Sequence, residues 1–327
     1  AAEQGDADAQ YNLALKYDNG EGVLKNDKTA VKWYALAAEQ GDADAQYNLA
    51  LKYENGEGVL KNDKTAVKWY TFAAEQGYVD AQFNLALKYD NGDGVLENDK
   101  TAVKWYTLGA EQGDAKAQLN LAIKYDKGEG VLENDKTAVK WYTLAAEQGI
   151  INAQYNLALK YENGEGVLEN DKTAVKWYTL AAEQGKANAQ FNLALKYDKG
   201  EGVLENDKTA VKWYTLAAEQ GKANAQYNLA VKYDNGEGVL ENDKTAVKWY
   251  TLAAEQGYAD AQGNLGVMYA FGEGVFTDNR RAYMWFNLAS YNGDENGGEN
   301  KDEIAKDMTS AQIDEAQDMS SRCLVSN

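Results

Sequence analysis

The chain has 327 residues and eight tryptophans, each 36 residues after the one before, so its length divides into eight periods and a remainder of 39 residues. It contains no histidine, which excludes Ser/His/Asp and Cys/His nucleophilic sites and a zinc site built on the commonest ligand. The 52 acidic residues outnumber the 33 basic ones, and a net charge of −19 has the wrong sign for nucleic acid or an anionic membrane surface.

The chain begins with Ala1-Ala2-Glu3-Gln4-Gly5, which matches residues 37–41 of the 36-residue period and is neither a start methionine nor a signal peptide. We therefore expect that something upstream of Ala1 has been removed or left out. No run of about 18 apolar residues appears, so no membrane span is predicted. The single cysteine, Cys323, cannot form an intrachain disulfide and leaves the redox compartment open.

Each period predicts two helices. Helix A covers residues 7–19 in the first period and ends at Gly20, and Gly22 lets the following loop turn back. Helix B begins at Asn26-Asp27, whose side chains can cap free N–H groups, and runs to residue 40. The apolar faces expected to be buried comprise Ala9, Leu13, Ala14 and Tyr17 in helix A and Ala30, Trp33, Tyr34 and Ala37 in helix B. One such hairpin buries too little surface to fold alone, so the periods must stack.

These residues, together with the Gly20-Glu21-Gly22-Val23 loop and Gly41, resemble the Sel1-like repeat, a relative of the tetratricopeptide repeat. The resemblance implies an all-α, right-handed α/α superhelical solenoid of eight 36-residue helix-turn-helix repeats over residues 1–288. Seven repeats have Leu-Ala where the family usually has Leu-Gly, as in Leu265-Gly266, and we expect the extra methyl group to widen the helix spacing slightly.

The resemblance further implies an adaptor or scaffold that binds other proteins, often in bacterial envelopes, in secretion or in endoplasmic-reticulum quality control. A bacterial periplasmic or secreted location is favoured over the cytoplasm on this ground. A branch of bacterial relatives has a disulfide in each repeat, and this chain lacks the cysteines for it.

The last repeat and the 39-residue remainder differ from the array. Met268, Phe271, Tyr283 and Met284 replace residues that we expect to be solvated in other repeats, such as Lys16, Asn19, Val31 and Lys32. We expect residues 289–327 to cover them with two short amphipathic helices, after a flexible loop at residues 292–298. The residues assigned to these helices are Ile304, Ala305 and Met308 in the first and Ile313, Ala316 and Ser320 in the second, with Thr309 or Ser310 as the cap.

On a helical wheel, the residues of helix A that lie opposite its apolar face form a second face, which predicts a binding surface on the concave side of the solenoid. An asparagine recurs there in every repeat, and a row of side-chain amides can hold an extended peptide backbone through paired hydrogen bonds. These asparagines are Asn12, Asn48, Asn84, Asn120, Asn156, Asn192, Asn228 and Asn264. Alternatively, each asparagine bonds the neighbouring helix, or near-identical repeats have simply inherited it.

Lysines and aromatic residues run beside the asparagines. The lysines, Lys16, Lys52, Lys88, Lys124, Lys160, Lys196 and Lys232, could read acidic ligands, or could be solvated and balanced by nearby acids. The aromatic position reads Tyr11, Tyr47, Phe83, Leu119, Tyr155, Phe191, Tyr227 and Gly263, and could form pockets or pack between helices. Bulky residues at Tyr78-Val79 and Ile150-Ile151 could likewise anchor a partner or pack locally.

No cofactor or metal site is predicted. The acidic Asp18-Asn19-Gly20-Glu21-Gly22 loops fail the EF-hand spacing, and neither a preceding strand nor a Lys-Ser/Thr pair supports a phosphate loop. Carboxylate pairs are numerous, but uniform repeats give no single pair a special environment, so we expect no enzyme. The leading hypothesis is a scaffold that binds an extended peptide or protein partner on the concave surface. The alternative is a structural protein that self-assembles through an uncapped N-terminal edge.

Overall fold

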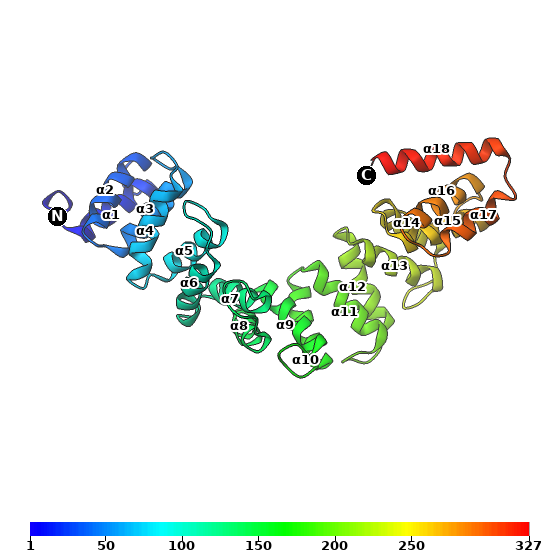
Figure 1. Cartoon of the computed structure of the whole chain (residues 1–327), viewed down its shortest axis with the longest axis horizontal. Helices are drawn as coiled ribbons and strands as arrows, with labels where there is room; N and C mark the ends of the chain where they lie inside the picture. The colour runs from blue at the N-terminus through cyan, green and yellow to red at the C-terminus, as the bar shows by residue number, and fades with distance from the viewer. Residues whose placement is uncertain (327) are drawn as a thin grey trace. The chain divides into compact units, whose positions relative to one another are not determined.

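The computed structural model describes residues 1–326, and all the regular secondary structure in that range is helical, with no strand (Figure 1). A short helix η1 (Ala2–Gln4) precedes eight A helices and eight B helices that alternate along the chain. The A helices are α1 (Ala7–Asn19), α3 (Ala43–Asn55), α5 (Val79–Asn91), α7 (Ala115–Lys127), α9 (Ile151–Asn163), α11 (Ala187–Lys199), α13 (Ala223–Asn235) and α15 (Ala259–Phe271). The B helices are α2 (Asp27–Glu39), α4 (Asp63–Glu75), α6 (Asp99–Glu111), α8 (Asp135–Glu147), α10 (Asp171–Glu183), α12 (Asp207–Glu219), α14 (Asp243–Glu255) and α16 (Asn279–Tyr291). The predicted all-α repeat fold is confirmed.

The helices form two compact units, residues 1–169 with α1–α9 and the residues from 170 onward with α10–α18. Within each unit, a B helix packs on the A helix before it and on the A helix after it wherever the unit contains both. Among the described residues, no helix is both long enough and apolar enough to cross a membrane.

The helix ends follow the predicted signals. The Asn26 side chain accepts a hydrogen bond from the Thr29 backbone N–H at 3.0 Å, and this cap recurs at the start of the next six B helices. Gly20 ends α1 with a φ of 75°, a left-handed conformation in which glycine has no Cβ penalty. The first two helices therefore lie where the sequence predicts them, to within one residue.

The loop of one repeat rests on the preceding repeat. Gly58 has a φ of 73°, and a Cβ added there would lie 2.4 Å from the carbonyl carbon of Asp27. Only glycine allows the loop backbone this close to the start of α2. The contact also brings Glu57, the neighbour of Gly58, to the end of α2 that carries Asp27.

Small residues and tyrosines fill the core. Ala14, Ala30, Tyr34 and Ala37 have no exposed surface, as predicted. Val31, expected to be solvated, is only 7% exposed and belongs to the same cluster, so that expectation was wrong. The valine lies between the two predicted core residues Ala30 and Trp33, which shows that the buried face of helix B is wider than the predicted stripe.

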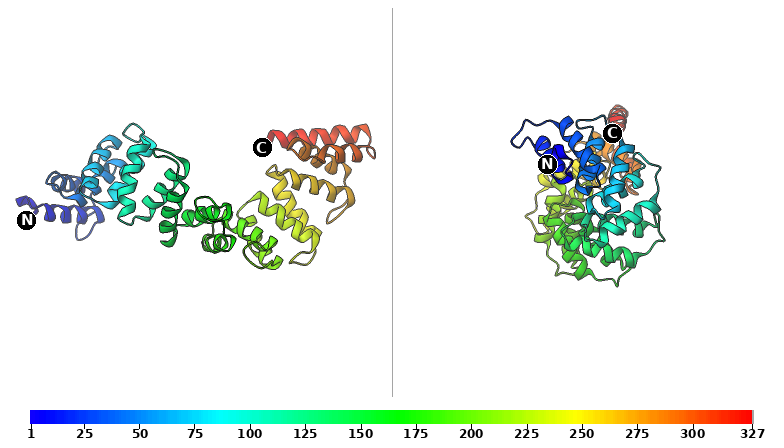
Figure 2. Two further views of the ribbon diagram at one scale, coloured as in Figure 1. Left: turned by 60° about the horizontal axis from the view of Figure 1, so that its bottom comes forward. Right: turned by 90° about the vertical axis from the view of Figure 1, so that its left-hand side faces the viewer.

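Two further helices follow the last repeat, α17 (Gly297–Ala305) and α18 (Ser310–Ser326), and both pack on α16 (Figure 2). Thr309 and Gln312 form a reciprocal cap at the start of α18, and Ala316 and Ser320 are buried, as predicted. The first cap helix was placed wrongly, because α17 begins at Gly297, inside the predicted loop, and ends before Met308. Gly297 makes this start feasible, since a Cβ there would lie 2.5 Å from the Ser290 backbone nitrogen.

The apolar residues of repeat eight are covered only in part by these helices. Gln317 of α18 donates a hydrogen bond to the Tyr283 hydroxyl, and Ser320 Oγ lies 3.5 Å from the Met284 carbonyl oxygen. Met268 is also buried, in a cluster that includes Tyr250 of repeat seven and against which Met319 of α18 packs. Phe271 stays 74% exposed, so the expectation that the cap covers it was wrong.

Candidate functional site

The half-buried face of the A helices that carries the recurring asparagines contains a pocket. It has a volume of about 370 Å³ and lies between α7 and α9 in the first unit. Its walls include Ile123 and Asp126 from α7 and Asn156, Leu159 and Lys160 from α9, with Tyr142 contributed by α8. The structure therefore brings Asn156 and Lys160 together, whereas the aromatic position of the same repeat, Tyr155, does not line this pocket.

The asparagines bond the preceding repeat. The side-chain amide nitrogen of Asn228 lies 3.2 Å from the Tyr214 hydroxyl, and Asn192 and Asn264 make the same contact at 3.0 Å with Tyr178 and Tyr250. Asn48 lies 3.5 Å from the Tyr11 hydroxyl and donates to a backbone carbonyl of its own helix at 3.0 Å. The alternative in which asparagine links neighbouring repeats thus has direct support. The amide oxygen of Asn228 accepts no hydrogen bond from any described residue.

Six of the seven lysines are buried, so the expectation that they are solvated was wrong, whereas the predicted balance by nearby acids is confirmed for them. Only Lys16 of the first repeat is exposed. The other six are 4–7% exposed, and their ammonium groups lie among carboxylates of the preceding repeat and of their own loop. These six are Lys52, Lys88, Lys124, Lys160, Lys196 and Lys232. Their ammonium groups therefore join neighbouring repeats, and a ligand-binding role for these lysines stays a prediction.

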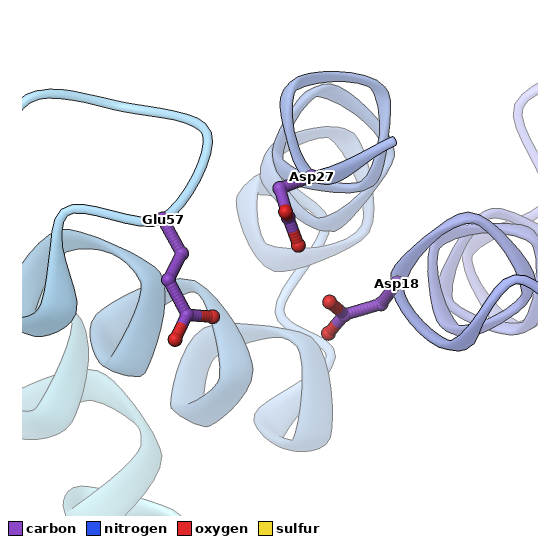
Figure 3. Close-up of side chains that lie close together, drawn as sticks. All are labelled: Asp18, Asp27 and Glu57. Atoms are coloured by element: carbon purple, nitrogen blue, oxygen red, sulfur yellow. The ribbon is translucent and has the colours of Figure 1, made fainter. Parts of the chain in front are cut away.

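Lys52 shows the arrangement. Its Nζ lies 2.5 Å from Asp18 Oδ1, 3.2 Å from Asp27 Oδ1 and 2.7 Å from Glu57 Oε2. Figure 3 shows the three carboxylates pointing toward one another from the end of α1, the start of α2 and the loop after α3. They could hold a metal ion by their spacing, because one oxygen of each lies within 4.8 Å of the others. The Lys52 ammonium already supplies the positive charge at this position.

Hydrogen bonding keeps these lysines charged. Burial alone would lower the pKa of Lys124, but hydrogen bonds to Asp90, Asp99 and Glu129 outweigh it and raise the pKa above its ordinary value of 10.5. The carboxylates around Lys88 are less closely gathered. Its Nζ lies 2.6 Å from Glu54 Oε1, but 3.6 Å from Asp63 Oδ1 and 3.9 Å from Asp93 Oδ2. Glu54 is one carbon longer than the aspartate that most repeats carry there, and Asp93 is one carbon shorter than the usual glutamate, so the carboxylates cannot all converge.

A buried tyrosine hydroxyl connects the asparagines to the lysine clusters. Tyr214 OH receives the bond from Asn228 and lies 3.1 Å from Asp198 Oδ2, and the other oxygen of Asp198 pairs with Lys232. Burial, followed by the charge of Asp198, raises the pKa of Tyr214 above its ordinary value of 10, so the hydroxyl remains a donor. Asn228 and Lys232, one turn apart on α13, thus reach the same aspartate of the preceding repeat.

The aromatic position is half-buried and packs between helices. The ring centroids of Tyr47 and Tyr70 are 5.9 Å apart, and Phe83, Phe191 and Tyr227 make similar contacts with the buried tyrosine of their own repeat. Tyr78 stacks on Tyr47 at 4.9 Å, so this bulky rim residue packs locally. Burial and the nearby Asp44 raise the pKa of Tyr78 to about 12.

The sequence reading missed a second connection between repeats. Gln82 is 3% exposed, donates to the Ala74 carbonyl at 3.1 Å and accepts from Gln112 at 2.8 Å. Equivalent glutamines recur in other repeats, and in the last repeat Asn292 is the donor to Gln262. The signal was present as a glutamine that recurs every 36 residues next to a buried alanine.

It also missed a row of exposed leucines in the loops between helices A and B. Each repeat has one leucine or phenylalanine there that is 89–95% exposed. These residues are Leu24, Leu60, Leu96, Leu132, Leu168, Leu204, Leu240 and Phe276. Their recurrence every 36 residues was visible in the sequence, but periodicity alone does not separate an exposed loop leucine from a buried one.

Comparisons with known proteins identify the repeat. The Sel1 repeat model matches residues 7–42, 43–78, 79–114, 115–150, 151–186, 187–222, 223–258 and 259–294. No curated protein matches the chain.

Two solved structures are similar over nearly the whole chain. The Sel1 repeat protein from Oxalobacter formigenes is 33% identical, with a TM-score of 0.69 and coverage of 91% of this chain and 86% of that one. A protective antigen from uropathogenic Escherichia coli strains that displays an SLR fold is 33% identical, with a TM-score of 0.55 and coverage of 99% and 85%. Sel1 repeat proteins are in general non-enzymatic scaffolds for protein interactions. The chain belongs to the Sel1 repeat family.

Proposed function

We propose that the chain is a scaffold that binds an extended peptide segment of a partner protein along the face of its A helices that carries the recurring asparagines. The observation that carries the proposal is the pocket between α7 and α9, which is lined by the half-buried side chains of Asn156 and Leu159. An amide beside an apolar side chain suits an extended peptide, because the amide can bond its backbone while the leucine contacts a side chain.

The buried lysines narrow the proposed site to the asparagines and their apolar neighbours. The amide groups of Asn192, Asn228 and Asn264 each donate to a tyrosine hydroxyl of the preceding repeat, which fixes their orientation before a ligand arrives. The oxygen of such an amide then faces a peptide N–H with little ordering cost. The lysines contribute indirectly, because they hold the aspartate to which that tyrosine donates.

The test uses a phage-displayed library of random twelve-residue peptides, selected on the wild-type protein. The best peptide is then measured by fluorescence anisotropy against the triple variant Asn84→Ala/Asn120→Ala/Asn156→Ala. We expect binding to weaken at least about tenfold, as for the loss of a few hydrogen bonds. The same peptide with alternate backbone nitrogens methylated should also bind poorly.

The matched control is the triple variant Lys64→Ala/Lys100→Ala/Lys136→Ala, which changes exposed residues of the B helices. It should bind the peptide as the wild type does, and circular dichroism should show that both variants fold. Unchanged affinity in the asparagine variant, or tolerance of N-methylation, would remove the proposed site. Self-association through the N-terminal edge stays a prediction that light scattering at high protein concentration can test.

A further inference from the structure

The loop between α15 and α16 departs from the other loops in its chemistry. Phe276 stands where other repeats have leucine, and Thr277 stands where repeats three to seven have glutamate. Arg281 replaces the threonine found at the same position in the other repeats, such as Thr245. Compared with repeats three to seven, this loop has lost one negative charge and gained one positive charge, in a chain whose net charge is −19.

These departures coincide with a pocket of about 800 Å³ in the second unit. Its lining includes Lys244 from the start of α14, Tyr269 from α15, Val275 and Phe276 from the loop, and Arg281 from α16. Phe276 is 95% exposed, so an apolar ring stands in solvent at the pocket. A volume of this size accommodates a short peptide segment rather than a single ion.

Arg281 is held in place before any ligand binds. Its Nη1 donates to the Tyr269 hydroxyl at 2.9 Å, and the guanidinium lies 5.3 Å from the centroid of the same ring. Its Nε lies 3.7 Å from Asp278, whose carboxylate also accepts from the Arg280 and Arg281 backbone N–H groups. The side chain remains about half exposed, at 53%. Its guanidinium therefore keeps donors for an incoming carboxylate.

Lys244 provides a second positive charge at the pocket. It is exposed and forms no ion pair with any described residue. A ligand that fits must bring an apolar group to Phe276, Val275 and Tyr269 and an anionic group within reach of Arg281 and Lys244. A segment of peptide that combines an aromatic or aliphatic side chain with acidic neighbours meets both demands.

A leucine-bearing loop of a second copy of this chain would also bring an apolar side chain and a carboxylate to the pocket, but its shape fits the pocket less well than an extended peptide does. Leu96 is followed by Glu97, yet the Asn98 backbone N–H is bonded to the Tyr89 carbonyl at 2.8 Å, and Gly94 rests on the backbone of Asp63. Such a loop is fixed as a compact turn, whereas a flexible segment can extend into the pocket.

We propose that this pocket binds an extended, acidic peptide segment of a partner protein, with an apolar side chain against Phe276 and carboxylates on Arg281 and Lys244. The proposal is independent of the A-helix surface, since it uses a different part of the repeat and none of the recurring asparagines.

The test is fluorescence anisotropy with a fluorescein-labelled peptide, Asp-Glu-Phe-Leu-Asp-Glu. We expect saturable binding that weakens at least about tenfold in Arg281→Glu and in Phe276→Ser, as for the loss of a charge-assisted hydrogen bond or a buried aromatic contact. Binding should also weaken with added salt. Two peptide controls separate the contributions: replacing the acids by Asn and Gln, or the Phe-Leu pair by two serines, should each reduce the affinity.

Leu240→Ser is the matched variant for Phe276→Ser, because it makes the same kind of change at the equivalent position of the preceding repeat. Lys208→Glu is the charge control, because it reverses an exposed charge of repeat six, at the position that corresponds to Lys244 of repeat seven and lies outside the pocket. Both should bind the peptide as the wild type does. Phe276→Ser alters an almost fully exposed side chain, so its fold should be intact even if Arg281→Glu melts earlier. Absence of saturable binding, or equal loss in the matched variants, would overturn the proposal. Self-association that Phe276→Ser abolishes would overturn the assignment to a separate partner.

Discussion

Two boundaries between repeats, one inside the array and one at its end, are held together by different interactions. Between repeats three and four, Lys124 lies 2.7 Å from Asp99, 2.9 Å from Glu129 and in direct contact with Asp90. Between repeats seven and eight, Met268 occupies the position of the lysine and is 2% exposed. The inner boundary joins repeats through charge, and the last boundary joins them through apolar contact.

The acids of the last boundary have lost their cation. Asp234, Asp243 and Glu273 stand where the inner boundary has its three partners of lysine, and none of them forms an ion pair with a described residue. Burial, with repulsion from Asp243 and Glu241, raises the pKa of Asp234 despite a hydrogen bond from Tyr250. At the inner boundary the buried lysine is the cation among three acids, whereas at the last boundary the three equivalent acids have none among the described residues.

The largest expected effect comes from making the inner boundary like the last one. Lys124→Met would leave Asp90, Asp99 and Glu129 without their cation, and we expect it to cost about 3 kcal/mol of the free energy of unfolding, as when one partner of a buried ion pair is removed. Urea unfolding followed by circular dichroism measures the loss, and hydrogen exchange should localise it to α6 and α7.

The reciprocal change is the control for this prediction. Met268→Lys should cost much less than Lys124→Met, because the new ammonium group would meet Asp234, Asp243 and Glu273. Adding Asp90→Asn to Lys124→Met should recover part of the lost stability, since it removes one uncompensated charge. If Lys124→Met were neutral, its carboxylates would not need neutralising and the comparison would fail.

The second prediction is that acid affects the two boundaries in opposite directions. The hydrogen bond from Lys124 lowers the pKa of Glu129 in the folded protein below its ordinary value of 4.5. The ionised carboxylate therefore stabilises the fold at pH values above 4.5, and this stabilisation is lost as the pH falls through the pKa of the folded protein. The pKa of Asp234 in the folded protein is raised above its ordinary value of 3.8. Its protonated form therefore stabilises the fold at pH values below 3.8, and this stabilisation is lost as the pH rises through the pKa of the folded protein.

Hydrogen exchange at pH 6 and pH 4, corrected for intrinsic rates, tests this difference. Protection of α7 should fall on acidification relative to that of α15. In Met268→Lys the contrast should shrink, because Asp234 would then have a cation of its own. Parallel changes in the two helices of the wild-type protein would contradict the assignment of these carboxylates.

The recurring residues made the fold predictable from sequence, but not what each of them contacts. Helix A and the Asn26 cap follow from spacing and side-chain chemistry within one repeat. Lys52, by contrast, looks solvated on the wheel of its own helix and is buried only because Asp18 and Asp27 of another repeat close over it. A helical wheel describes one helix and cannot show such a contact.

The glycine of repeat eight makes the same point. That alanine in place of glycine slightly widens the helix spacing stays a prediction; alanines such as Ala86 are fully buried at this position. Gly266 is needed for another reason, since a Cβ there would lie 2.7 Å from the ring of Phe286. The binding roles of the asparagines stay a prediction, because a bond to a neighbouring tyrosine does not decide whether a ligand also binds.

The smallest expected effect concerns the tyrosine that donates to the shared aspartate. Tyr106 OH lies 3.1 Å from Asp90 Oδ2, while its ring is fully buried. Tyr106→Phe keeps the ring and removes one hydrogen bond, so we expect a loss of about 1 kcal/mol in the free energy of unfolding, measured by urea titration. Repeat eight already carries Phe286 at this position and Ala270 in place of the aspartate.

Phe286→Tyr therefore supplies the control, because its hydroxyl would meet no carboxylate at the position of Ala270. The substitution should not raise the free energy of unfolding, and it should lower it if the new hydroxyl is buried without a hydrogen-bond partner. A gain in Phe286→Tyr, or a loss in Tyr106→Phe as large as in Lys124→Met, would mean that the ring environment rather than the aspartate decides the tyrosine's contribution. The expected order, with the lysine first and the tyrosine second, follows because the lysine neutralises three acids whereas the tyrosine bonds one.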